Sequence, residues 1–199
     1  MPSTSGSPDF PALPADFRLP AARPGRAVPL RGRPAVVAYL RVHLYGAAVG
    51  RSLLARCVGS VGPEDRRRLL PLRGQFDGEI EVAAQLLSRL TPFGAPGRRL
   101  LRVSSGVTLS FLPVGPGMID PLTRLGALES LRTLVVAKKS MWLLLADWIT
   151  SGGPATADDN VEGGDEHARS LFIGLADQAA GQEDLLEELR RAYGLAAFR

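Results

Sequence analysis

The sequence has few of the side chains that carry most enzyme chemistry: one cysteine and two histidines among 199 residues. A single thiol, Cys57, cannot form an intrachain disulfide, which fits a reducing cytoplasm. No zinc-binding spacing, glycine-rich phosphate loop or G-x-S-x-G nucleophile elbow occurs. We therefore expect a cytoplasmic protein outside the common zinc, nucleotide-binding and serine hydrolase classes.

Long hydrophobic runs are also absent. The densest apolar stretch, 141–146, is far shorter than the roughly 20 residues that span a bilayer. The first residues show no basic segment followed by an apolar one, so no secretory signal is predicted. With 45% hydrophobic residues and a mean hydropathy of +0.06, the chain is typical of one globular domain.

Lysine is nearly missing, since Lys138 and Lys139 are the only two among 24 basic residues. The net charge is +4, and the acidic residues concentrate in the last quarter of the chain. This asymmetry could mark a basic surface for an anionic partner, or an acidic last helix packed beside basic neighbours. The abundance of arginine, alanine, glycine and leucine can also reflect genome base composition, which weakens a nucleic-acid interpretation.

What the chain does contain is proline at its start and helical periodicity afterwards. Residues 1–33 hold seven prolines and little apolar pattern, which predicts a disordered tail. Residues 34–194 predict a helical domain, beginning with a helix over 34–59 whose buried face includes Gly46 and Gly50.

Three further helices are predicted at 64–90, 120–150 and 165–193. Pro71 should break or kink the first of them, Asp120 should cap the second, and Gly194 should stop the third. The long connection at 91–119, with a possible short helix or strand inside it, allows the helices on either side of it to run parallel. The predicted fold class is all-α: a four-helix bundle of up-down-down-up topology with one long crossover between its second and third helices.

Three segments carry a resemblance to a known family: Tyr39-Leu40-Arg41-Val42-His43-Leu44-Tyr45-Gly46-Ala47, Pro121-Leu122-Thr123-Arg124-Leu125-Gly126-Ala127-Leu128-Glu129 and Lys138-Lys139-Ser140-Met141-Trp142. They resemble uncharacterised bacterial proteins of the ferritin-like superfamily. The resemblance covers roughly residues 34–193 and implies a ferritin-like four-helix bundle. It implies no assigned activity.

The di-iron chemistry of that superfamily is not encoded here. Such a site takes a Glu from each of two helices and a Glu-x-x-His from each of the other two. Leu40 precedes His43 by three residues and Gly164 precedes His167, so no Glu-x-x-His exists. We predict no metal and no cofactor; an all-carboxylate site from Glu79, Glu129, Asp147 and Asp177 is the alternative.

Four residues are candidates for a polar bundle core. His43 shares a stripe with the two glycines, and is interpreted as a core histidine or as a ligand or proton-transfer group. Glu129 lies among leucines and would need a buried partner such as Arg132, Arg124, Lys138 or His43. Glu79 and Asp177 occupy the expected ligand positions of the second and fourth helices.

Arg66, Arg67 and Arg68 form a basic cluster at the start of the second helix. They are candidates for anion binding, or a solvated surface paired with Glu64 and Asp65.

Three functions follow. The first is a non-catalytic interaction or scaffold protein, forming a homodimer through the apolar surface around Trp142 and Trp148 or binding another protein. The second is a divergent carboxylate-bridged di-metal oxidase or hydroxylase. The third is a basic protein that binds nucleic acid or a membrane surface, of which we disfavour nucleic acid. No catalytic residue is assigned.

Overall fold

The computed structural model of the chain describes residues 30–91, 120–152 and 164–199. Within these ranges the protein is all-helical: α1 (Arg33–Ser60), α2 (Pro63–Leu69), α3 (Pro71–Leu90), α5 (Pro121–Thr150) and α6 (Gly164–Ala197). The four long helices pack together, as predicted. The expected tail up to residue 29, the connection at 92–119 and the loop at 153–163 lie outside the described residues.

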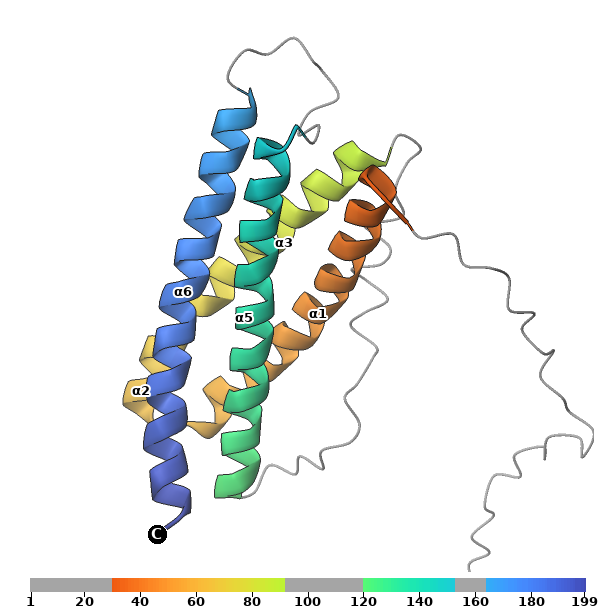
Figure 1. Cartoon of the computed structure of the whole chain (residues 1–199). Helices are drawn as coiled ribbons and strands as arrows, with labels where there is room; N and C mark the ends of the chain where they lie inside the picture. The colour runs from red at the N-terminus through yellow and green to blue at the C-terminus, as the bar shows by residue number, and fades with distance from the viewer. Residues whose placement is uncertain (1–29, 92–119, 153–163) are drawn as a thin grey trace, which may run out of the picture.

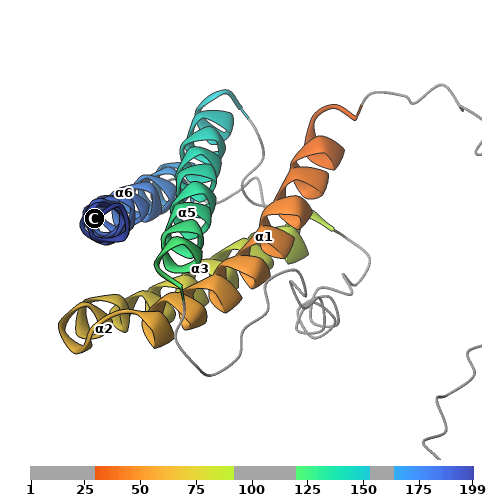
Figure 2. The same ribbon diagram turned by 90° about the horizontal axis from the view of Figure 1, so that it is seen from below.

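The long helices form two antiparallel pairs. Helix α1 lies beside α3, α5 lies beside α6, and the two pairs cross obliquely (Figures 1 and 2). In Figure 1, α1 and α6 run downward while α3 and α5 run upward. The most extensive contact is between α5 and α6, and α1 packs against both α3 and α5. Residues of three or four helices can therefore meet in the interior.

The predicted second helix is divided at Pro71, as expected from the sequence. Leu70 separates α2 from α3 and keeps a helical backbone, with φ −56° and ψ −41°. Because proline has no backbone N–H, the carbonyl four residues earlier cannot receive its usual hydrogen bond. The helix is consequently interrupted at Leu70, while Leu69 and Leu72 on either side of it stay buried.

The start of α5 and the end of α6 test two of the predicted helix signals. Asp120 caps α5, its carboxylate accepting hydrogen bonds from the backbone of Leu122 and Thr123, both at 3.1 Å. Gly194 does not stop α6, which continues to Ala197. Instead, a Cβ at Gly194 would lie 3.4 Å from a methyl group of Leu125. The glycine thus serves close helix packing rather than termination.

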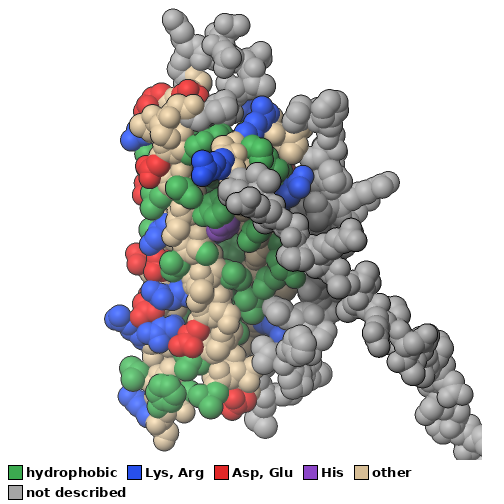
Figure 3. Space-filling model, turned by 45° about the vertical axis from the view of Figure 1, so that its right-hand side comes forward, with side chains coloured by type: hydrophobic (Ala, Val, Ile, Leu, Met, Phe, Trp, Pro, Cys, Tyr) green, Lys and Arg blue, Asp and Glu red, His purple; other side chains and the backbone are tan. Residues whose placement is uncertain are grey.

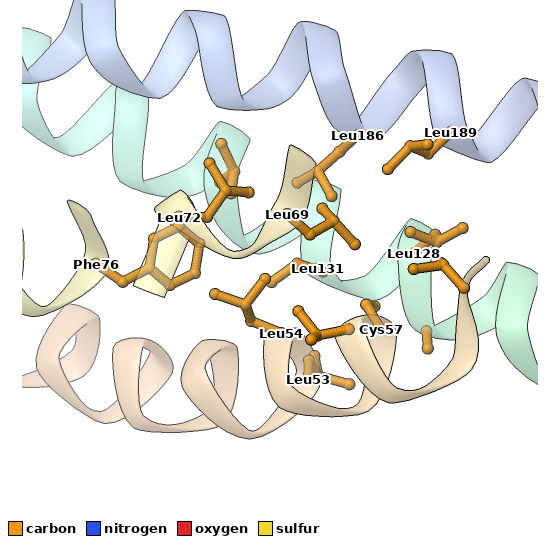
Figure 4. Close-up of a cluster of buried hydrophobic side chains, with 14 of the residues drawn as sticks. Leu53, Leu54, Cys57, Leu69, Leu72, Phe76, Leu128, Leu131, Leu186 and Leu189 are labelled. Atoms are coloured by element: carbon orange, nitrogen blue, oxygen red, sulfur yellow. The ribbon is translucent and has the colours of Figure 1, made fainter. Parts of the chain in front are cut away.

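Two apolar clusters fill the interior. One joins the lower part of α1, α2, the start of α3, α5 and α6, with Leu54, Leu69, Leu128 and Leu186 almost fully buried (Figure 4). The other surrounds Trp142, which is 1% exposed and stacks on Phe172 of α6 at 5.6 Å between ring centres. The expectation that Trp142 contributes to a dimer surface is therefore wrong, because its side chain is used inside the bundle.

Among the described residues, each helix is either too short or too polar to cross a membrane.

Candidate functional site

A buried acidic side chain lies at the centre of the bundle. Glu79 of α3 is 3% exposed, and Gln182 of α6 is 2% exposed; these are the two buried polar or charged side chains within 30–91, 120–152 and 164–199. Burying an ionised carboxylate is costly unless it is paired and hydrogen-bonded. The surroundings of Glu79 supply both kinds of partner.

Four side chains complete this polar network around Glu79. The ammonium group of Lys138 from α5 forms an ion pair with one carboxylate oxygen. The amides of Gln178 and Gln182 donate to the other oxygen at 2.7 Å and 2.9 Å. Gln182 also accepts from Lys138 at 2.6 Å and donates to Gln75 at 2.9 Å. We call Gln75, Glu79, Lys138, Gln178 and Gln182 the core polar network.

Burial and attraction act in opposite directions on Lys138. Burial lowers the pKa of its ammonium group, while the charge and hydrogen bond of Glu79 oppose that change. The ammonium group also lies over the Phe76 ring, 4.1 Å from its centre, where the ring quadrupole attracts a cation. The network therefore holds one positive and one negative charge, which neutralise each other inside the bundle.

A pocket of about 180 Å³ adjoins this network. Its wall comes from α1, α3 and α5 and is mostly apolar; Phe76, Met141 and Trp142 contribute to it, as do Gly46 and Gly50. His43, Glu79 and Lys138 are its ionisable residues. The pocket is partly open, and Val42 of α1, which also lines it, is 68% exposed.

His43 is half-buried in the wall of this pocket. Its ring meets Tyr39 edge-on at 4.5 Å between centres. Burial lowers the pKa of the imidazole below its ordinary value of 6.5, so the neutral form dominates at pH 7. Among the described residues no side chain or backbone group hydrogen-bonds to it. His43 and Glu79 thus share one pocket, as two of the four polar-core candidates.

The other two polar-core candidates are on the surface. Glu129 is 52% exposed and faces Arg190 of α6 at 3.4 Å, so the predicted buried acid is wrong. Asp177 is exposed as well, while its neighbour Gln178 faces the network. One residue corresponds to a rotation of about 100° around a helix. A displacement of one position therefore moves a side chain from the interior to solvent.

The three arginines at the start of the α2–α3 segment have different partners. Arg66 donates to the carbonyl of Val58 at 3.0 Å, capping the end of α1. Arg68 forms a two-point contact with Glu188 of α6 and lies 3.6 Å from Asp65. Arg67 is exposed. Because two of the three guanidinium groups bind protein atoms, the cluster does not present three free charges to an anion.

The residues of the alternative carboxylate site do not converge. Glu129, Asp147 and Asp177 are exposed, whereas Glu79 is buried and paired with Lys138. In the described part of the chain no three His, Cys, Asp or Glu side chains gather closely enough to hold a metal ion.

Cys57 is fully buried in the lower apolar cluster, and burial raises the pKa of its thiol to about 12. The thiol is therefore a packing group.

Sequence reasoning missed the pairing of Lys138 with Glu79. The sequence does show that Lys138 interrupts the apolar stripe of the helix at 120–150. It also shows that Gln178 and Gln182 lie in the apolar stripe of the helix at 165–193. The periodicity places such residues on an inward face. It does not say which residue of another helix they meet.

Comparisons of the chain with protein-family models, curated proteins and solved structures gave no match.

Proposed function

We propose that this chain is a ferritin-like bundle that lacks a metal-dependent catalytic centre and serves as an interaction or scaffold protein. One observation carries the first part of the proposal. The ammonium group of Lys138 contacts the buried carboxylate of Glu79, in the part of the core where metal-binding bundles gather their ligands. A protein-borne cation occupies the position in which a metal ion would neutralise the carboxylate.

The residues around Glu79 do not suit a pair of metal ions. Di-metal carboxylate sites need several carboxylates and histidines that project inward from four helices. Here the neighbours of Glu79 are two glutamine amides that donate hydrogen bonds and one ammonium group. A metal ion would have to displace Lys138 and would then meet a single carboxylate. We therefore derive no metal-dependent reaction from this centre.

The directions of the helices support the ferritin-like part of the proposal. Helices α3 and α5 run the same way (Figure 1), so the end of α3 and the start of α5 lie at opposite ends of the bundle. One long crossover between two antiparallel pairs is the arrangement of ferritin-like folds.

The interaction role is supported by leucines on the outer side of α5. Leu143 and Leu144 are 45% and 53% exposed, although they follow the buried Met141 and Trp142 directly. Exposed leucines side by side on one helix suit contact with a protein surface, including a second copy of the chain. We include a cytoplasmic location in the proposal because of the single cysteine.

Metal analysis tests the non-catalytic part. Protein expressed in iron- and manganese-supplemented medium should contain no stoichiometric metal. A stoichiometric metal that disappears in Glu79→Gln would contradict the proposal and favour the di-metal oxidase or hydroxylase. Metal retained in that variant would place a centre elsewhere and would contradict it as well.

Sedimentation tests the interaction role in its homodimeric form. The full chain should sediment as a dimer at micromolar concentration, and Leu143→Gln/Leu144→Gln should shift it toward monomer. Leu195→Gln, a change of another exposed leucine at the end of α6, is the matched control. A wild-type monomer removes the homodimer from the proposal.

A further inference from the structure

The pocket beside the core polar network has room for a small molecule. Its volume of about 180 Å³ exceeds that of an engineered 150 Å³ apolar cavity that binds benzene. A compact molecule of one aromatic ring matches this space. Because the pocket is partly open, such a molecule has a way in.

Two glycines on α1 create part of the space. A Cβ at Gly46 would come no closer than 3.9 Å to Leu134. A Cβ at Gly50 would lie 3.7 Å from Phe76 and 3.8 Å from Leu134. These are ordinary van der Waals distances, so alanine would fit at both positions. Helix packing therefore does not require these glycines, although each lowers the stability of α1 relative to alanine.

The charges in the wall favour an uncharged occupant. Lys138 and Glu79 neutralise each other and have hydrogen-bond partners from α6. A charged molecule entering the pocket would lose its hydration without gaining an unpaired opposite charge. A neutral, mainly apolar molecule loses little on entering and buries apolar surface.

His43 supplies the polar group for such a molecule. The imidazole lies in the pocket wall and has no hydrogen-bond partner among the described residues. A neutral imidazole has one N–H donor and one acceptor nitrogen. It can therefore bind a single hydroxyl or carbonyl group on a ligand. Figure 3 shows a face on which hydrophobic side chains gather with a histidine among them, while acidic and basic side chains follow its left edge.

We propose that this pocket binds a neutral, compact, mainly apolar molecule of about one aromatic ring, whose single polar group hydrogen-bonds His43. The proposal goes beyond the interaction role and does not depend on it, because the pocket lies between α1, α3 and α5 rather than on the outer side of α5.

Phenol and toluene are suitable probes, since they have similar ring size and differ in the polar group. Ligand-observed NMR titration of the full chain should show saturable binding of both, with phenol binding more tightly. Benzoate, the charged counterpart, should bind at least about tenfold more weakly than phenol, corresponding to about 1.4 kcal/mol. Absence of saturable binding for both phenol and toluene, or benzoate binding as tightly as phenol, overturns the proposal.

The glycines allow a matched pair of variants. Gly46→Ala/Gly50→Ala adds two methyl groups to the pocket and should weaken both probes at least about tenfold. Gly74→Ala/Gly78→Ala adds two methyl groups at the same spacing on the exposed side of α3, where nothing lies within 4 Å, and should bind as the wild type does. Both doubles should remain folded, because alanine favours helix. Equal binding by both doubles overturns the site.

His43→Leu tests the polar contact separately. It should weaken phenol binding while toluene binding changes little, so the preference for phenol should disappear. An unchanged preference would overturn the role of His43.

Discussion

Lys138 of α5 and Glu79 of α3 form an ion pair across the interior of the bundle, with the lysine side chain 16% exposed and the glutamate 3%. Their other hydrogen bonds in the core polar network come from Gln178 and Gln182 of a third helix, α6. The pair therefore links three helices through one point.

The first prediction compares the loss of stability when one partner of this ion pair is substituted with the loss when both are. Lys138→Met should lower the free energy of unfolding by about 3 kcal/mol, because it leaves a buried carboxylate without a counter-charge. Glu79→Gln should also destabilise, because the ammonium group then lacks its carboxylate. The double variant should lose at least about 1 kcal/mol less than the sum of the singles. Urea unfolding of the four proteins measures this coupling, and additive losses would contradict a paired charge.

The second prediction concerns Tyr193, which ties α6 to the start of α2. Its hydroxyl donates to Asp65 at 2.8 Å and accepts from the backbone N–H of Gly62 at 2.9 Å. Tyr193→Phe removes both bonds and should lower the free energy of unfolding by about 1 kcal/mol. Tyr45→Phe is the matched control, since Tyr45 is 52% exposed, and it should change stability little. Equal effects of the two substitutions in thermal or urea unfolding would contradict this role.

The third prediction concerns the start of α5. Asp120→Ala removes the acceptor for two backbone N–H groups and should cost about 1 kcal/mol in urea unfolding. Asp120→Asn keeps a side-chain oxygen acceptor and should retain most of that stability. A loss as large in the asparagine variant as in the alanine variant would show that the charge, rather than the cap, matters.

The fourth prediction concerns Glu187 and acid. Hydrogen bonds from Arg190 and Arg191, together with the nearby charge of Arg132, lower the pKa of this carboxyl group to about 2 from an ordinary value of 4.5. Its contribution to stability should therefore be fully present above pH 4.5 and be lost as the pH falls toward 2.

Glu187→Gln isolates this effect. The stability difference between wild type and this variant, from urea unfolding across pH 2 to 5, should shrink as the pH falls. It should also shrink with added salt, because these charges lie at the surface. A difference that does not depend on pH would show that Glu187 acts through packing alone.

Much of the fold follows from local signals in the sequence. Apolar spacing identifies the four long helices. Pro71 interrupts a helix because it lacks a backbone N–H, and Asp120 begins one because its carboxylate accepts hydrogen bonds from the first turn. Gly194 shows the limit of such signals. A glycine that ends a helix and a glycine that admits a neighbouring side chain look the same in one sequence.

The site was only partly predictable, for two physical reasons. The first is rotation: Glu129 and Asp177 each lie one position from a buried residue, and a single step around the helix exposed them. The second is that the axial position of one helix against another depends on packing of the whole bundle. The partners of Glu79 came from α5 and α6, at positions that periodicity alone does not align.

The uneven packing of the helices has a consequence for how the protein opens. Helix α5 makes its most extensive contact with α6, whereas α1 borders a pocket with Gly46 and Gly50 in its wall. Amide hydrogens in the middle of α5 and α6 should therefore exchange slowest with deuterated water, through global unfolding only. Those around Gly46 and Gly50 should exchange through smaller fluctuations of α1, which makes this helix the part of the bundle that loosens first.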